Sequence, residues 1–225
     1  MGTSRDFAES IQYFCIHFPP FLFAVIFHEF GHGWMASRWG DRTAQMAGRL
    51  TLNPGPHIDP VGTLLFPAIN MLTGIPLLIG WAKPVPIDPN RFRKYRPGLF
   101  WVSAAGPGMN VVIAFISAFF AAAFVRFVPR DFYLFDPLKG MLVASVMVNY
   151  SLAIFNLLPL PPLDGSKIIE SILPIGLSQK YERLSQYSFW ILMALLISGA
   201  LSILSGPITA ATHGTLAIAA SLFFS

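Results

Sequence analysis

Residues 99–125 read LFWVSAAGPGMNVVIAFISAFFAAAFV and contain no Asp, Glu, Lys or Arg. A helix needs about 20 apolar residues to cross the hydrocarbon core of a bilayer, so this stretch is long enough to span. The other stretches of this kind are 60–82, 140–163, 184–225 and, interrupted only by Glu29, 17–37. The pattern predicts a polytopic membrane protein.

The overall composition indicates the same class. The chain has 225 residues, of which 54% are hydrophobic and 12% charged, and its mean hydropathy is +0.59. Globular domains carry about 25% charged residues. These values exclude a soluble enzyme and a nucleic-acid-binding protein. The net charge of +4 is typical of membrane proteins whose basic loops face the cytoplasm.

The apolar stretches predict an all-α fold with about five transmembrane helices. We expect the first helix to begin between Phe7 and Pro20 and to end near Gly40, which suits a C-cap. The later helices are predicted at 99–125, 140–158, 187–204 and 206–224.

Three segments do not read as spanning helices. Residues 60–82 are apolar but interrupted by prolines and a glycine, which predicts a re-entrant segment. Residues 83–96 are polar and rich in proline, which predicts a surface loop. Residues 43–53 alternate weakly before an Asn-Pro-Gly-Pro turn, so we expect a short membrane-associated β segment there.

A re-entrant segment at 60–82 also gives a consistent topology. It leaves one crossing, 99–125, between the first helix and 140–158, so those two helices run in the same direction. Eleven of the fifteen Lys and Arg residues then lie on one side of the membrane. The four on the other side are Arg5, Arg126, Arg130 and Lys139. The positive-inside rule places the larger group in the cytoplasm.

Residues 28–32 form an HExxH motif, His28-Glu29-Phe30-Gly31-His32, inside the first predicted helix. Positions i and i+4 share one face of a helix, so the two imidazoles can bind one Zn²⁺. Glu29 between them can take a proton from a water that the metal activates. An ionisable residue in a spanning segment is costly, which favours a functional role. The alternative is a polar clamp between helices, with Glu29 protonated and the histidines hydrogen-bonded.

Asp164 is the candidate for a third metal ligand, because a catalytic zinc site commonly has three. It closes the uncharged stretch 140–163 and follows Pro159, Pro161 and Pro162. Backbone that departs from helix at membrane depth is tolerated where it lines a cavity. The alternative is that Asp164 caps the segment that follows it.

Three segments together resemble the signature elements of the site-2 protease family, which are intramembrane zinc metalloproteases. They are the HEFGH helix, the segment Gly106-Pro107-Gly108-Met109-Asn110, and the segment from Asn156 to Asp164-Gly165. The resemblance covers residues from about 20 to 170. The resemblance is to the compact members of the family, which lack PDZ and cystathionine-synthase-type domains. It implies one membrane-embedded peptidase domain over residues 1–225.

The resemblance implies a role for each matching residue. The zinc ligands would be His28, His32 and Asp164, and the catalytic base would be Glu29. Asn156 and Asn110 would lie near the active site, and each either contacts substrate or makes an interhelical hydrogen bond. Gly106 and Gly108 indicate close helix packing. Outside these segments, His57 either makes a further metal or regulatory contact or belongs to a turn in which Asp59 caps the next segment.

We therefore expect a zinc endopeptidase that cleaves transmembrane segments of other membrane proteins within the lipid bilayer. Its active site would face the cytoplasmic half of the cell membrane, and the small size suggests a prokaryote. The segment 48–53 would pair with an extended substrate by strand addition. The alternatives are a membrane zinc transporter, although the chain lacks the repeats typical of that class, or an inactive homologue that serves as a binding module.

Overall fold

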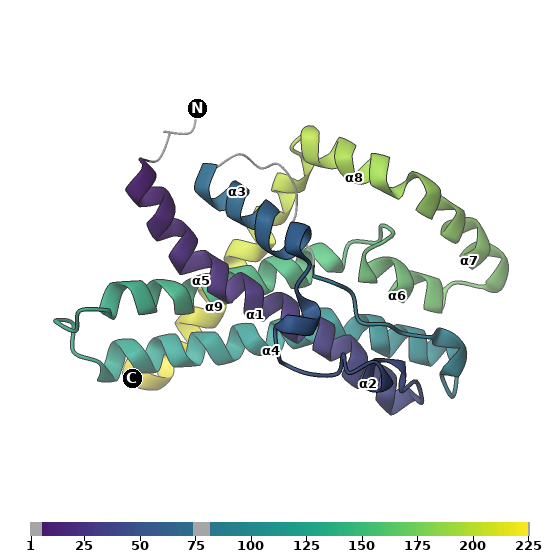
Figure 1. The fold of residues 1–225 in the computed structure, drawn as a ribbon, viewed down its shortest axis with the longest axis horizontal. Coiled ribbons are helices and arrows are strands. Elements are labelled where there is room, and N and C mark those ends of the chain that lie inside the picture. Colours follow the sequence, from purple (N-terminus) through teal and green to yellow (C-terminus); the bar gives the residue numbers. More distant parts are fainter. Residues whose placement is uncertain (1–5, 74–81, 225) are drawn as a thin grey trace.

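The computed structural model describes residues 6–73 and 82–224, and these residues fold into helices and loops (Figure 1). Four helices among them are long and apolar enough to cross a membrane. They are α1 (Phe7–Trp39), α4 (Tyr95–Phe127), α5 (Phe135–Asn156) and α9 (Ser205–Phe224), with α9 extended by a 3-10 turn that starts at Ala200. The chain is an all-α polytopic membrane protein, as predicted.

Shorter elements connect these four helices. They are α2 (Thr43–Met46), a π-helical turn (Pro60–Leu65) continuous with α3 (Phe66–Thr73), α6 (Asp164–Ile172), α7 (Ile175–Glu182) and α8 (Ser188–Ile197). Single 3-10 turns lie at Gly55–His57, Pro89–Arg91 and Arg183–Tyr187.

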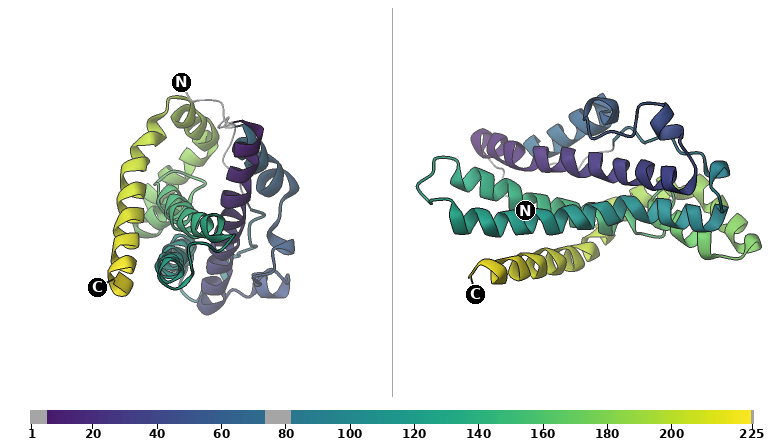
Figure 2. Two further views of the ribbon diagram at one scale, coloured as in Figure 1. Left: turned by 90° about the vertical axis from the view of Figure 1, so that its left-hand side faces the viewer. Right: turned by 90° about the horizontal axis from the view of Figure 1, so that it is seen from below.

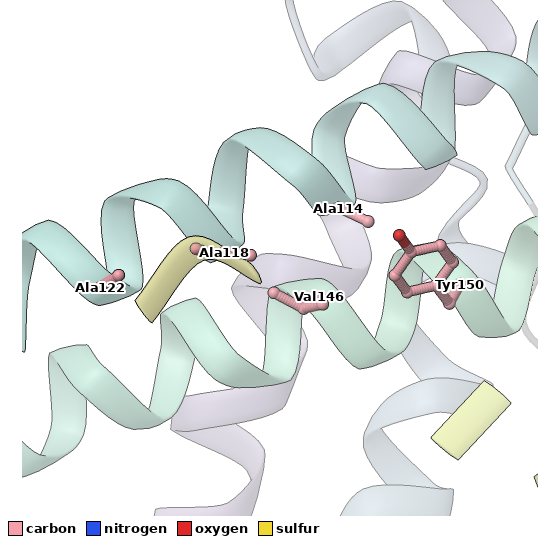
Figure 3. Close-up of a cluster of buried hydrophobic side chains, with 6 residues drawn as sticks. Ala114, Ala118, Ala122, Val146 and Tyr150 are labelled. Carbon is pink, nitrogen blue, oxygen red and sulfur yellow. The ribbon is translucent and has the colours of Figure 1, made fainter. Parts of the chain in front are cut away.

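Helices α1, α4 and α5 form the centre of the molecule. Figures 1 and 2 show α1 and α5 running in the same direction and α4 in the opposite one, as the predicted topology requires. Where α4 faces α5, it presents Ala114, Ala118 and Ala122 toward Val146 and Tyr150 (Figure 3). Small side chains let the two helix backbones approach closely, which strengthens packing in a lipid environment.

Helix α1 begins and ends where its sequence predicts. Asp6 and Glu9 form a capping box, in which each side chain accepts a hydrogen bond from the backbone amide of the other residue. Gly40 terminates the helix with φ of 109°, a left-handed conformation that glycine adopts without a steric penalty.

The segment that begins at Pro60 returns to the place where it started. The amide of Lys83 donates to the carbonyl of His57 at 2.9 Å, so the two flanks of the segment lie together. The described apolar helix, Pro60–Leu72, is shorter than a spanning helix and packs against α1. This agrees with the predicted re-entrant path, while residues 74–81 lie outside the described part of the chain.

The predicted β segment at 43–53 is wrong. Residues Thr43–Met46 form α2, and the rest is irregular, with Gly48 at a φ of 66°. The amide of Asn53 binds the hydroxyl of Thr51, and that of Gly55 binds the side chain of Asn53. Local side chains therefore satisfy amides that a β ladder would have used.

Four of the predicted spanning helices are long enough to span in the described residues, and the exception is the one at 187–204. The predicted helix at 187–204 is interrupted at Gly199, which has a φ of 71°. This leaves α8 only ten residues long, too short to cross a bilayer. The final helix, α9, is instead long enough to span when its preceding 3-10 turn is included.

Candidate active site and metal centre

Three potential ligand atoms converge where α1 meets the start of α6. Nε2 of His28 lies 3.1 Å from Nε2 of His32, and Oδ2 of Asp164 lies 3.1 Å and 3.3 Å from these two atoms. In the described part of the chain this is the group of His, Cys, Asp and Glu side chains that could hold a metal ion. The structure thus brings together the three residues predicted to bind zinc.

The second nitrogen of each imidazole is fixed by helix α4. Nδ1 of His32 donates to the backbone carbonyl of Val102 at 2.7 Å, and Nδ1 of His28 donates to Oδ1 of Asn110 at 2.6 Å. Because a neutral imidazole carries one hydrogen, each Nε2 keeps a free lone pair directed toward the other ligand atoms. Hydrogen-bonded partners of this kind orient the histidines of metal sites.

A chain of buried amides sets the orientation of Asn110. Its Nδ2 donates to the carbonyl of Ala24 at 3.0 Å and to Oδ1 of Asn149 at 2.9 Å, which leaves its oxygen for His28. Asn149 in turn donates to the carbonyl of Ser145 at 2.9 Å. Both asparagines are fully buried. Asn110 therefore orients a candidate metal ligand. Asn149 could not be found from the sequence, because no local pattern indicates a buried amide chain.

The three ligand atoms suit a zinc ion. In a tetrahedral site with Zn–N distances of about 2.0–2.1 Å, neighbouring ligand atoms lie about 3.3 Å apart, close to the separations seen here. Oδ2 of Asp164 is buried. Because both imidazoles present lone pairs to it, it receives no hydrogen bond. Three electron-rich atoms this close repel one another unless a cation lies among them.

Gly106 of α4 makes room for this arrangement. A Cβ at that position would lie 2.6 Å from Cε1 of His32 and 2.8 Å from Cε1 of His28, both far inside van der Waals contact. Gly108, by contrast, is exposed, and a Cβ there would meet no atom within 4 Å. The predicted close packing is therefore confirmed for Gly106 and wrong for Gly108.

Asp164 does not cap the helix that it begins. The N-cap position of α6 is Leu163, and no side chain forms a capping hydrogen bond there. The carboxylate of Asp164 instead points to the two histidines. Gly165 allows this approach, because a Cβ on it would overlap the carbonyl groups of Leu157 and Leu158 at the end of α5.

Glu29 contacts a segment that the sequence indicated only as a surface loop. We call residues 82–92 the proline loop, since it contains Pro84, Pro86 and Pro89. The backbone amide of Val85 in this loop donates to Oε2 of Glu29 at 2.7 Å. The loop thus forms one wall of the site, next to the HExxH motif.

Asp41 anchors the proline loop and is a second residue that the sequence reasoning missed. It is fully buried just after α1 and accepts hydrogen bonds from the amide of Asp88, at 2.7 Å, and from the amide and hydroxyl of Thr43. Burial alone would raise the pKa of Asp41, but these hydrogen bonds and the charge of Arg91 hold it below its usual range. Asp41 is therefore ionised at neutral pH.

Two cavities meet at the site and share His28, Glu29, Asn156 and Pro162. One has a volume of about 310 Å³ and is otherwise apolar, lined by Val25, Ala82, Leu152, Phe155, Leu163 and Leu192. The other, of about 250 Å³, is lined by the other two candidate metal ligands, His32 and Asp164, and by polar groups such as Ser103 and Lys167. The site therefore has an apolar face and a polar face.

The remaining predicted residues divide between site and scaffold. Asn156 lines both cavities, and its amide donates to the carbonyl of Leu152 at 3.0 Å. His57 lies in a turn and binds the carbonyl of Thr51, at 2.8 Å, through Nε2. Asp59 caps the following π-helical turn by accepting from two of its amides. Of the two readings of His57, the structure supports the turn histidine.

Comparison with known proteins agrees with the zinc site that the geometry indicates. The model of Peptidase family M50 matches residues 136–199. The chain is 34% identical over 196 residues to the protein named "Putative zinc metalloprotease YwhC" of Bacillus subtilis. The aligned region covers 84% of this chain and 86% of that protein. The chain is 30% identical over 181 residues to "Putative zinc metalloprotease Rip2" of Mycolicibacterium smegmatis, covering 80% of this chain and 66% of that protein. No solved structure matches the chain.

The match to the relative from Bacillus subtilis covers more than four fifths of this chain and of that protein. The part of the chain that the structure describes also contains four helices long and apolar enough to span a membrane. The chain therefore belongs to the M50 family of site-2 proteases and is a zinc metalloprotease with membrane-spanning helices.

Proposed function

We propose that this protease hydrolyses peptide bonds inside the transmembrane segments of other membrane proteins. The observation that carries the proposal is the position of the three ligand atoms and Glu29 among helices that can span a membrane, at the wall of an apolar cavity. A helix hides its carbonyl groups in internal hydrogen bonds, so a substrate helix must partly unwind before it is cleaved. The apolar cavity suits the side chains of such an unwound segment.

The proposed roles of the residues follow from their chemistry. His28, His32 and Asp164 hold zinc, which when bound activates water and polarises the scissile carbonyl. Glu29 acts as the general base: it accepts a proton from the attacking water and passes it to the departing amine. Asn156, at the junction of the two cavities, is placed to contact the substrate backbone.

The polar cavity offers a route for water, the second reactant, to the site. Peptide hydrolysis consumes water, and the apolar cavity alone would exclude it. Lys167 and Asp164 line the second cavity, on the side where α6 and the proline loop lie. We propose that water reaches Glu29 by this route while the substrate occupies the apolar side.

We also propose that the active site lies toward the cytoplasmic half of the membrane. With the segment after Pro60 re-entrant, eleven of the fifteen basic residues fall on the side of α2, the proline loop, α6 and α7. Basic loops favour the cytoplasm. The bacterial source of the relatives supports the cell membrane of a bacterium as the location.

The test is cleavage of a defined transmembrane substrate by purified protein in lipid vesicles, with mass spectrometry of the products. We expect wild-type protein to cut within the membrane segment, and Glu29→Gln to retain zinc but lose cleavage. A zinc transporter would instead move zinc into vesicles in both forms and cleave in neither. Cleavage by Glu29→Gln at the wild-type rate would contradict the assigned base.

A further inference from the structure

The Glu29 carboxylate has a main-chain partner outside its own helix. Its Oε2 accepts a hydrogen bond of 2.7 Å from the amide of Val85, which is buried and lies 56 residues further along the chain. A glutamate side chain on a helix has several accessible rotamers, so this contact selects one of them. The donor is a backbone atom, and a motif defined by side chains does not reveal it.

The sequence Lys83-Pro84-Val85-Pro86 makes this amide unusually well defined. Proline has no backbone N–H, so Val85 carries the single amide donor within residues 84–86. A residue before proline is restricted to extended conformations, which applies to both Lys83 and Val85. The two prolines therefore hold the backbone extended on both sides of the one amide that reaches Glu29.

Contacts on both sides keep this stretch against α1. Upstream, the guanidinium of Arg49 donates to the carbonyls of Lys83 and Pro84 at 2.7 Å and 3.1 Å. Downstream, Asp41 accepts from the amide of Asp88. Val85 itself packs on Gly33, where an added Cβ would lie 3.1 Å from its side chain.

We propose that the main-chain amide of Val85 positions the general base. By holding Oε2, it fixes the rotation of the carboxylate and leaves Oε1 to accept the proton from the attacking water. The inference rests on the proposed function of Glu29 as base and adds the group that sets its geometry. In this role Val85 acts through Glu29 and does not itself touch the reacting atoms.

The first test compares two variants at the same position. Val85→Pro removes the N–H and suits an extended backbone, whereas Val85→Ala keeps the N–H and removes most of the side chain. We expect kcat of Val85→Pro to fall about 10- to 100-fold below that of Val85→Ala, because small misplacements of catalytic groups cost up to about 100-fold. KM and bound zinc should be equal in the two variants. If Val85→Pro does not fold, a main-chain ester at Val85 removes the same hydrogen.

The second test measures the contact without activity. Hydrogen exchange of the Val85 amide should be slow in wild type and at least tenfold faster in Glu29→Ala, while the Asp88 amide, bound to Asp41, stays protected in both. Equal kcat in Val85→Pro and Val85→Ala, or an unchanged Val85 exchange rate in Glu29→Ala, would overturn the positioning role alone. A wild-type protein that cleaves no transmembrane substrate would overturn the proposed function itself.

Discussion

The two sides of the active site are built differently. On the helix side, the two candidate metal-binding histidines are held by α4 through Asn110 and Val102, deep among α1, α4 and α5. On the loop side, Glu29 is contacted by the proline loop, which Arg49 and Asp41 hold in place. The two proposed roles, metal binding and proton transfer, therefore rest on separate parts of the structure.

The surroundings of the two sides also differ. Asn110 and Asn149 are fully buried among helices, where water cannot replace a lost partner, and an unsatisfied buried polar group costs about 1–3 kcal/mol. Lys83 and Pro84 of the proline loop are exposed, so water can replace some of its hydrogen bonds. We therefore expect changes on the helix side to remove zinc and changes on the loop side to lower the rate with zinc retained.

The largest effect is expected for Gly106→Ala. The added methyl group would overlap both imidazoles, so zinc affinity should fall at least 100-fold and cleavage should be lost. Gly108→Ala is the matched control, because its methyl group meets open space one half-turn away. Zinc titration of the two purified proteins checks this, and equal affinities would contradict the close approach of α4 to the metal site.

A smaller loss is expected for Asn110→Leu. Removing the hydrogen-bond partner of a metal-binding histidine commonly weakens metal affinity about 10- to 100-fold, and here it also frees Nδ1 of His28. Cleavage should recover in part when zinc is added in excess. The control is Ser117→Ala on the same helix, which removes a 2.8 Å hydrogen bond to Ser145 of α5 and should bind zinc as wild type does. Zinc loss in both variants would instead indicate a general defect of α4.

On the loop side, Asp41→Asn should reduce cleavage about tenfold without loss of zinc. An amide has one acceptor oxygen, so it cannot satisfy the donors from Thr43 and Asp88 as the carboxylate does. Asp136→Asn is the control, since Asp136 is exposed and its ion pair with Lys139 is 4.0 Å long. Zinc content and cleavage rate, measured together, separate the two sides of the site.

The smallest effect is expected for pH, which changes how firmly Asp41 holds the proline loop. The folded pKa of Asp41 lies below its unfolded value of about 3.9. Its stabilising contribution is therefore complete above about pH 3.9 and is lost as the pH falls through the folded pKa. Protection of the Asp88 amide against hydrogen exchange should decline over that range in wild type, and this decline should be absent in Asp41→Asn.

The helix side could largely be predicted from the sequence. The spacing of His28 and His32 fixes their shared helix face, and the position of Asp164 after an uncharged stretch indicates a carboxylate that needs a cation. The direction of α5 followed from requiring these residues to meet. These inferences succeed because helical periodicity and membrane depth are regular properties that a single sequence displays.

The loop side could not be predicted in the same way. The contact of Val85 with Glu29 depends on a backbone amide and on a path through residues 83–88, and no side-chain pattern encodes either. The wrong β segment at 43–53 has a related cause, since local hydrogen bonds of Thr51 and Asn53 replaced the expected ladder. The break at Gly199 was missed because apolar composition alone does not reveal where a helix ends.

The most direct test of the account is the zinc content of three purified proteins: wild type, Glu29→Gln and Asp164→Ala. We predict close to one zinc per chain in wild type and Glu29→Gln, and loss of zinc in Asp164→Ala, because that variant lacks one of the three converging ligand atoms. Undiminished zinc in Asp164→Ala would contradict the three-ligand centre.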